Sequence, residues 1–248
     1  PKMIERFQIV EYHRSFLSGR VSWGITNSML IVSGAFGVFK KQPVIEAGGY
    51  KTNTIGEDME IVVRLHRLMK NHRRKYKIIF CEDAVCWTQG PMSVKDIRGQ
   101  RRRWQIGLLD TLISHASMFL NPFYGFVGLF AIPYNWIFEL LGAIVEVLGY
   151  FIIPFSLLMG ELNMFFFICY FLLSVLLGII LSIGSLILEQ YTKKNEMTPK
   201  QCMALSIYAI LENFGYRQLI TLFRVEGILK YRKLRKTWGK IKRKNVEQ

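Results

Sequence analysis

Two short clusters in the first half of the chain combine residue types that can act on a sugar or a phosphate. The first is Gly56-Glu57-Asp58, which follows a turn and begins a predicted helix. A carboxylate at the start of a helix stays ionised, because the positive end of the helix dipole stabilises it. Asp58 could therefore accept the proton of a substrate hydroxyl, with Glu57 as its neighbour. The alternative is plain helix capping, since acidic residues are favoured in a first turn whatever the function.

The second cluster is Gln100-Arg101-Arg102-Arg103-Trp104. Gln100, Arg103 and Trp104 are spaced i, i+3 and i+4, so a helix places them on one face. Arg103 can form two hydrogen bonds to a diphosphate, Gln100 can bond phosphate or hydroxyl oxygens, and Trp104 offers a flat apolar surface to a pyranose ring. The alternative is a basic patch beside a membrane, in which Arg101 and Arg102 contact anionic lipid.

An α/β layer is expected to position both clusters, because predicted strands and helices alternate over the first 115 residues or so. Residues 29–39 mix β-branched and aromatic side chains with glycine, which predicts a buried strand. Two shorter strands are predicted over residues 76–80 and 84–87. The spacing of apolar residues predicts helices over residues 58–71 and 93–115.

The composition becomes strongly apolar after Pro122. From residue 126 to residue 159 only Glu139 and Glu146 are charged, and residues 164–188 contain no charge. About 20 apolar residues are enough to cross a bilayer as a helix. These patterns predict membrane spans over residues 137–158 and 164–188.

Two further segments suit the surface or the edge of a membrane. Residues 4–17 repeat apolar side chains at helical intervals among charged ones, which fits either a membrane-interface helix or a packed surface helix. Residues 203–229 are apolar but include Glu212 and Arg217, which are costly in hydrocarbon unless they face protein or water. We therefore expect a third apolar helix there that is re-entrant or interfacial.

These observations predict three parts: residues 1–121, a membrane region over residues 122–229, and a basic cytoplasmic tail over residues 230–248. Lys and Arg outnumber Asp and Glu by 33 to 18, so the formal net charge is +15. Such a charge favours nucleic acid, anionic lipid or a phosphate-bearing substrate. The basic residues form no nucleic-acid motif, so nucleic acid is not an expected partner. The four cysteines lack the spacing of a zinc site, and no metal site is predicted.

The order of the motifs resembles that of a known family. An SGAFG segment at residues 33–37, then Gly-Glu-Asp, then Gln-Arg-Arg-Arg-Trp, followed by apolar helices, is similar to the processive family 2 glycosyltransferases. Cellulose, chitin, hyaluronan and poly-N-acetylglucosamine synthases belong to that group. The resemblance implies an incomplete GT-A domain, the acceptor half, followed by transmembrane and interfacial α-helices. It also implies inversion at the anomeric carbon.

The resemblance also implies a role for each motif. Asp58 would be the general base on the acceptor hydroxyl, with Glu57 beside it. Gln100 and Arg103 would hold the donor diphosphate, and Trp104 would stack under the acceptor sugar. Contacts near the terminal sugar of the acceptor are expected from three consecutive residues, Ser33, Gly34 and Ala35.

The implied reaction transfers a hexose or N-acetylhexosamine from a nucleotide sugar to a glycan or a lipid-linked acceptor, and processive polysaccharide synthesis is one form of it. No two aspartates are separated by a single residue, so no cofactor is expected within this chain, although the complete enzyme would use Mg²⁺ or Mn²⁺. Membrane lipids are expected partners, and so is a separate chain carrying the donor-binding half. The expected location is the plasma membrane, multi-pass, with the catalytic part cytoplasmic. The alternative is a catalytically incomplete membrane-associated fragment, or a binding or scaffold protein.

Overall fold

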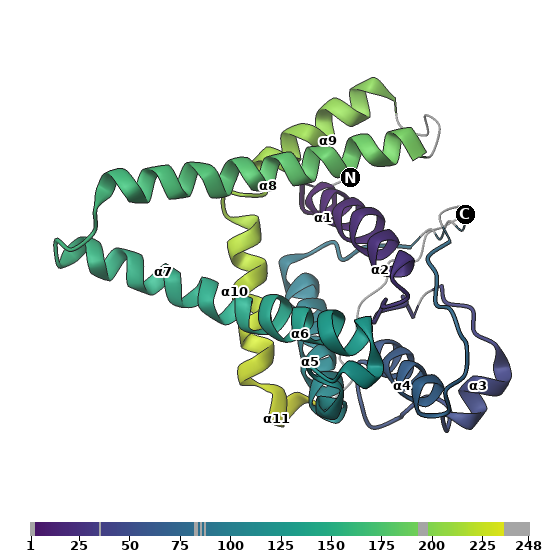
Figure 1. Ribbon diagram of the computed structural model, residues 1–248. Coiled ribbons are helices and arrows are strands. Elements are labelled where there is room, and N and C mark those ends of the chain that lie inside the picture. The colour runs from purple at the N-terminus through teal and green to yellow at the C-terminus, as the bar shows by residue number, and fades with distance from the viewer. Residues whose placement is uncertain are drawn as a thin grey trace. The chain divides into compact units, whose positions relative to one another are not determined.

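The computed structural model describes residues 3–34, 36–81, 84, 86, 88–192 and 198–235 (Figure 1). It divides into two compact units, each discontinuous in the sequence. The apolar-helix unit comprises Pro1–Arg20 and Ile144–Leu222, and the site unit comprises Val21–Ala143 and Phe223–Gln248. The sequence predicted three consecutive parts, over residues 1–121, 122–229 and 230–248. That division differs from these two units, and it stays a prediction.

The site unit is built mainly on two helices. Helix α4 (Glu57–Asn71) and helix α5 (Val94–Ser114) confirm the helices predicted over residues 58–71 and 93–115. Helix α5 begins after Ser93, whose hydroxyl accepts a hydrogen bond from the Asp96 amide at 3.2 Å. The smaller helical elements are α2 (Val21–Ile25), α3 (Lys41–Glu46), η2 (Ala116–Met118), η3 (Pro122–Tyr124), η4 (Val127–Ala131), α6 (Ile132–Tyr134), η5 (Asn135–Leu141) and α11 (Tyr231–Leu234).

The apolar stripe of α4 is buried on two sides. Met59 and Val63 pack with Leu108 and Leu112 of α5 in the main core of the unit. A second cluster covers another side of the helix, where Val32, Phe39, Val44, Ala47 and Ile78 pack against Ile61, Val62 and Leu65. Burial of each such side chain contributes about 1.5–3 kcal/mol to the stability of the fold. Because α4 supplies buried side chains to both clusters, it is the central element of this unit.

The α/β class is not confirmed, because the described residues contain helices and turns but no strand. The described residues of the segments predicted as strands, 29–39 and 76–80, form no β-ladder, and the first contains a turn in which the Phe36 amide donates to the Ser33 carbonyl at 3.1 Å. Part of their backbone is hydrogen-bonded by side chains: Asn27 accepts from the Ile78 amide at 2.8 Å and donates to the Tyr76 carbonyl at 3.0 Å. A strand needs a neighbouring strand for its N–H and C=O groups, and local pattern cannot supply one. The third predicted strand, residues 84–87, lies partly outside the described residues.

The apolar-helix unit contains α1 (Met3–His13), η1 (Arg14–Arg20), α8 (Met164–Thr192) and α9 (Pro199–Leu211), together with most of α7 (Gly142–Leu158) and the first half of α10 (Tyr216–Leu229). Its core joins Val10 of α1, Leu186 of α8, and Leu205 and Ala209 of α9. Part of the predicted segment 4–17 is thus α1, packed against α8 and α9.

The single helix predicted over residues 203–229 is wrong, because the structure has two helices there, α9 and α10. The break falls at Gly215, whose φ of 104° suits glycine and few other residues. The Gly215 amide donates to the Gln218 side chain at 2.7 Å, which begins the second helix. Asn213 binds back to the Ala209 carbonyl at 3.0 Å and completes the end of the first.

Two helices are long and apolar enough, by length and composition, to cross a membrane: Val127–Leu158, with 32 residues, and Met164–Leu188, with 25 residues. Only 11% and 6% of their most apolar stretches are buried within the protein, whereas the core helix of a soluble protein is mostly buried. The second matches the predicted span at both ends. The first begins earlier than predicted, because η4, α6 and η5 continue directly into α7.

Candidate active site

Asp58 lies in the first turn of α4, directly against the backbone of the segment 33–34. Its Oδ1 accepts the Met59 amide at 2.8 Å, and its Oδ2 accepts the Gly34 amide at 3.2 Å. A Cβ added to Gly34 would lie 3.4 Å from Oδ2, at ordinary van der Waals distance, so the backbone of this segment packs directly on the carboxylate. Two backbone donors therefore fix the orientation of the carboxylate.

A pocket opens beside this carboxylate. Its walls come from the extended segment before α3, the loop before α4 and α4 itself. They are formed by Val32, Ser33, Gly34, Gly37, Phe39, Tyr50 and Asp58. Phe39 and Val32 are anchored on α4 through the second apolar cluster. The pocket thus combines an oriented carboxylate with two aromatic rings.

Glu57 precedes Asp58 and is only partly exposed. Burial raises the pKa of Glu57, and the neighbouring Asp58 charge raises it further, while a backbone hydrogen bond opposes both. The two adjacent acidic residues therefore have different surroundings. Glu57 is the one that holds a proton more readily than an ordinary glutamate.

One face of α5 meets the start of α4. Gly107 follows Gln100 by seven residues, so it shares a helix face with Gln100, Arg103 and Trp104. A Cβ added to Gly107 would lie 2.7 Å from the Gly56 Cα, so the two backbones touch. Gly56 immediately precedes Glu57 and Asp58. The α5 face that carries the predicted diphosphate and sugar contacts therefore adjoins, at Gly107, the turn that carries Glu57 and Asp58.

Trp104 is 48% exposed, and the Arg101 guanidinium lies over its ring, 4.3 Å from the centroid. Arg101 itself is only 4% exposed. A guanidinium held over a half-exposed indole contributes about 0.5–2 kcal/mol and restrains the ring. Arg103, next to Trp104, is partly buried, and this burial lowers its pKa. A desolvated guanidinium binds a phosphate more strongly than one in water.

The opposite side of α5 is held by ion pairs. Glu226 of α10 accepts two hydrogen bonds from Arg98, at 2.7 and 2.8 Å, and contacts Arg102 at 3.2 Å and Lys230 at 2.6 Å. The Arg98 hydrogen bonds are the largest cause that lowers the pKa of Glu226 to about 2. Arg101 and Arg102 are therefore engaged inside the site unit, which counts against a lipid-binding role for this pair.

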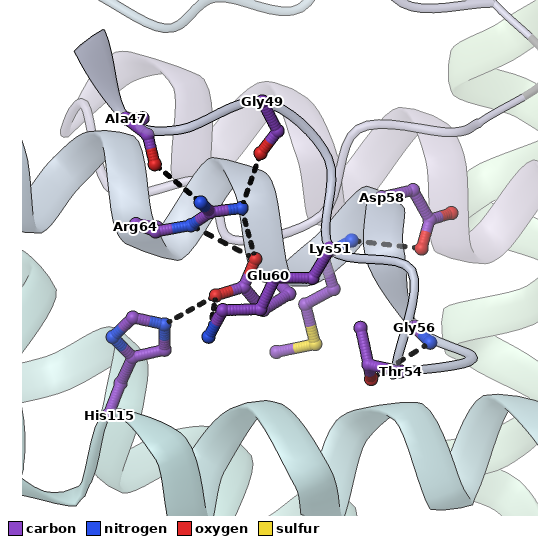
Figure 2. A network of polar contacts seen from close by, with 10 residues as sticks. Ala47, Gly49, Lys51, Thr54, Gly56, Asp58, Glu60, Arg64 and His115 are labelled. Carbon is purple, nitrogen blue, oxygen red and sulfur yellow. Dashed lines mark hydrogen bonds and ion pairs between the residues drawn. The ribbon is translucent and has the colours of Figure 1, made fainter. Parts of the chain in front are cut away.

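Glu60, two residues after Asp58, is the centre of a buried polar cluster (Figure 2). Its carboxylate lies 2.8 Å from Lys51 Nζ, 2.7 Å from an Arg64 nitrogen and 3.3 Å from His115 Nε2. Burial alone would raise its pKa, but the hydrogen bonds from His115 and Lys51 and the Arg64 charge outweigh it and lower the pKa to about 2. Figure 2 shows the Asp58 carboxylate away from this cluster.

Another buried polar side chain, His66, connects α4 to both extended segments. Its Nε2 lies 2.9 Å from the Met29 carbonyl and its Nδ1 lies 2.8 Å from the Tyr76 hydroxyl. Nε2 therefore carries the proton and Nδ1 accepts from Tyr76. Burial lowers the pKa of His66 to about 4 and raises that of Tyr76 to about 12, so both are neutral at pH 7.

The structure brings together only some of the predicted site residues. Ser33 and Gly34 line the pocket with Asp58, whereas Ala35 lies outside the described residues. The lining of this pocket does not include Glu57 or the α5 trio of Gln100, Arg103 and Trp104. Sequence reasoning missed the residues of the Glu60 cluster and Tyr50. The local signal for this cluster was the spacing of Glu60 and Arg64, because side chains four residues apart in a helix can form an ion pair.

No group of three or more His, Cys, Asp or Glu side chains that could hold a metal ion occurs among the described residues. The divalent metal expected for the complete enzyme therefore has no fitting donor set in the part of the chain that the structure covers.

Comparisons with known proteins identify the family of this chain. A family model, "Glycosyl transferase family group 2", matches residues 2–184. A poly-β-1,6-N-acetyl-D-glucosamine synthase of Staphylococcus aureus (strain COL) is 28% identical over 111 residues, which are 45% of this chain and 26% of the relative. A probable glucomannan 4-β-mannosyltransferase of Arabidopsis thaliana is 29% identical over 105 residues, 42% of this chain and 18% of the relative.

No solved structure matches the chain. The chain covers 26% of the length of the bacterial synthase that it resembles. The family model nevertheless extends over most of the 248 residues, including both clusters of the candidate site. The chain therefore belongs to glycosyl transferase family group 2.

Proposed function

We propose that this chain carries the acceptor side of the active site of a membrane-integrated glycosyltransferase. The reaction transfers a hexose or N-acetylhexosamine from a nucleotide sugar to a glycan or lipid-linked acceptor, with inversion. One observation carries the proposal: Asp58 borders a pocket, and the turn that holds it touches the α5 face of Gln100, Arg103 and Trp104 through Gly56 and Gly107.

In this mechanism the acceptor hydroxyl enters the pocket within hydrogen-bond reach of Asp58, about 2.6–3.2 Å. Asp58 takes the hydroxyl proton as the oxygen attacks the anomeric carbon from the side opposite the leaving group. The bond from that carbon to the diphosphate breaks, and the electron pair leaves with the nucleoside diphosphate. Arg103 and Gln100 stabilise the charge that develops there. Trp104 supports the acceptor sugar, its ring held by Arg101.

The names of the relatives support a polysaccharide product. One is a synthase of an N-acetylglucosamine polymer and the other a mannosyltransferase. The family match also supports reading residues 1–121 as part of a GT-A domain, with Mg²⁺ or Mn²⁺ in the complete enzyme. We place the protein in the plasma membrane, multi-pass, with the site on the cytoplasmic side. Lipids and a donor-binding half, in the same or a separate chain, complete the expected partners.

The test is sugar transfer by the full-length gene product in isolated membranes, with labelled UDP-N-acetylglucosamine and GDP-mannose as donors. Asp58→Asn should lower the transfer rate roughly a hundred- to ten-thousand-fold, because the amide cannot accept the proton. Donor binding should be retained. Asp110→Asn is the matched control, since Asp110 accepts a hydrogen bond from Tyr231 at 2.5 Å and does not line the pocket.

Near-normal transfer by Asp58→Asn would overturn the base assignment and leave Asp58 as a helix-capping residue. Absence of transfer by the unchanged protein with both donors, while it still binds an acceptor oligosaccharide, would favour the binding or scaffold alternative.

A further inference from the structure

We propose that Tyr50 is the sugar-binding wall of the Asp58 pocket and that the cluster of Glu60, Arg64 and Lys51 positions it. The ligand is the terminal hexopyranose ring of the acceptor. This inference rests on the proposed function and deepens it, because it says which residue beside the base selects a sugar.

The composition of the pocket points to a pyranose ring. Asp58 supplies an acceptor for a hydroxyl, and the rings of Tyr50 and Phe39 supply apolar surface. A sugar presents both kinds of surface, since its hydroxyls lie around the rim and its C–H groups form a flat apolar face. Phe39 is packed against the α4 cluster, whereas Tyr50 is 50% exposed and open to a ligand.

Tyr50 stands in a loop whose backbone is tied to α4 on both sides of it. Before Tyr50, the Arg64 side chain donates to the carbonyl of Ala47 and to that of Gly49, the latter at 2.7 Å (Figure 2). After Tyr50, the Lys51 ammonium lies 2.8 Å from Glu60. Glu60 also holds Arg64 at 2.7 Å, so one buried carboxylate fixes both neighbours of Tyr50.

The shape of the loop explains why such a clamp is required. Gly48 and Gly49 have φ values of 86° and 71°, a left-handed backbone that glycine adopts without strain. A pair of glycines has many other conformations available, so the loop holds one shape only if other contacts restrain it. Arg64 provides these contacts from a helix that also carries Asp58. The aromatic wall and the base are therefore positioned by the same rigid element.

The test measures acceptor use and donor hydrolysis separately, in membranes containing the full-length gene product, with a β-1,6-linked N-acetylglucosamine trisaccharide as the acceptor probe. Tyr50→Ala should raise the acceptor KM about three- to tenfold, while hydrolysis of the nucleotide sugar by water and the donor KM stay unchanged. Tyr50→Phe should keep the acceptor KM within about twofold, because the ring remains. Phe123→Ala is the control, since Phe123 is equally exposed, at 50%, and lies outside the pocket.

The clamp is tested by Lys51→Ala and Glu60→Gln. Both should raise the acceptor KM by about twofold or more without changing the donor KM, which a purely structural role would not produce. Lys51 is 39% exposed at its side chain, so Lys51→Ala should fold even if Glu60→Gln does not. Saturation-transfer NMR with the same trisaccharide gives a readout without catalysis, in which Tyr50→Ala should lose the signal that Tyr50→Phe keeps.

An unchanged acceptor KM in Tyr50→Ala, in an assay where Asp58→Asn abolishes transfer, would overturn this inference and leave the proposed function standing. Normal transfer by Asp58→Asn would instead overturn the assignment of Asp58 as the base in the proposed function. A KM change in Tyr50→Ala that Lys51→Ala and Glu60→Gln do not share would overturn the clamp.

Discussion

Asp58 and Glu60 are two residues apart in one helix, yet their surroundings are opposite. Asp58 accepts two backbone amides and borders a pocket, without an ion pair among the described residues. Glu60 is fully buried, with Lys51, Arg64 and His115 around it. Residues two apart in an α-helix point about 200° apart, so one faces the pocket and the other the interior. The same functional group is thus available for chemistry on one side and serves as an anchor on the other.

The apolar-helix unit contains a second anchor of the Glu60 kind. Glu212 is fully buried, is paired with Arg14 and lies 2.8 Å from the Ser182 hydroxyl of α8. Glu60 and Glu212, both buried, are therefore each held by a cationic side chain. Asp58 differs because backbone amides fix its orientation and leave its charge open to a ligand.

The largest expected effect on stability comes from removing the anchor. Glu60→Ala leaves Arg64 and His115 without their carboxylate in a buried site, and breaking a buried ion pair in this way costs about 3–5 kcal/mol. Asp58→Ala should cost about 1 kcal/mol, because only two backbone hydrogen bonds are lost. Unfolding of the detergent-solubilised protein, followed by circular dichroism, measures both. Equal losses would contradict the contrast between the two carboxylates.

Acid should act first on His66, also on α4, and not on Glu60. The folded pKa of His66 is about 4 and its unfolded pKa is about 6.5, so between these values only the unfolded chain binds the proton. The free energy of unfolding should therefore fall as the pH drops from 6.5 to 4, by roughly 1.4 kcal/mol for each unit of difference in pKa. The pKa of Glu60 is about 2 in the folded chain and about 4.3 in the unfolded chain. Its contribution to the free energy of unfolding is therefore lost only as the pH falls below about 4.3.

The measurement is the unfolding midpoint between pH 7.5 and pH 4.5. His66→Gln should flatten the dependence in this range. His72→Gln is the control, because His72 is exposed at the end of the same helix, and it should keep the slope of the unchanged protein. A slope that persists in His66→Gln would show that another group carries it.

A smaller effect is expected where α4 and α5 touch. Gly107→Ala would place a Cβ 2.7 Å from the Gly56 Cα, and such overpacking costs about 1–3 kcal/mol. Because the contact joins the acidic turn to the face of Arg103 and Trp104, sugar transfer should fall as well. Gly99→Ala in the same helix meets nothing within 4 Å and should stabilise by roughly 0.5–1 kcal/mol. Unfolding and transfer assays on both variants would separate helix propensity from the contact.

The smallest expected effect distinguishes neighbouring arginines. Arg101→Lys should weaken acceptor use by about 1 kcal/mol, because an ammonium cannot stack on Trp104 as a guanidinium does. Arg102→Lys should cost less, since a lysine can still pair with Glu226. Acceptor KM and the tryptophan emission of both variants test this order. Equal, negligible effects would restore the membrane-facing interpretation of both side chains.

Helices were predictable because their signals are local. The period of apolar residues and the acidic first turn predicted α4, and the uncharged run of residues 164–188 predicted most of α8. The strands predicted over residues 29–39 and 76–80 are not confirmed, because a strand depends on a partner, and here the side chains of Asn27 and His66 hydrogen-bond part of the backbone instead. Gly215 was visible in the sequence, but its left-handed conformation, which separates α9 from α10, was not.

The sequence by itself determined the motifs, their order, the apolar runs and hence the family. It also placed Gln100, Arg103 and Trp104 on one helix face, since that follows from spacing alone. Only the tertiary structure decided which carboxylate faces a pocket and which is buried, because burial depends on residues far away in the chain: His115 reaches Glu60 across 55 positions. It likewise decided that Arg101 covers Trp104, that Glu226 holds Arg102 and that Tyr50 stands beside Asp58.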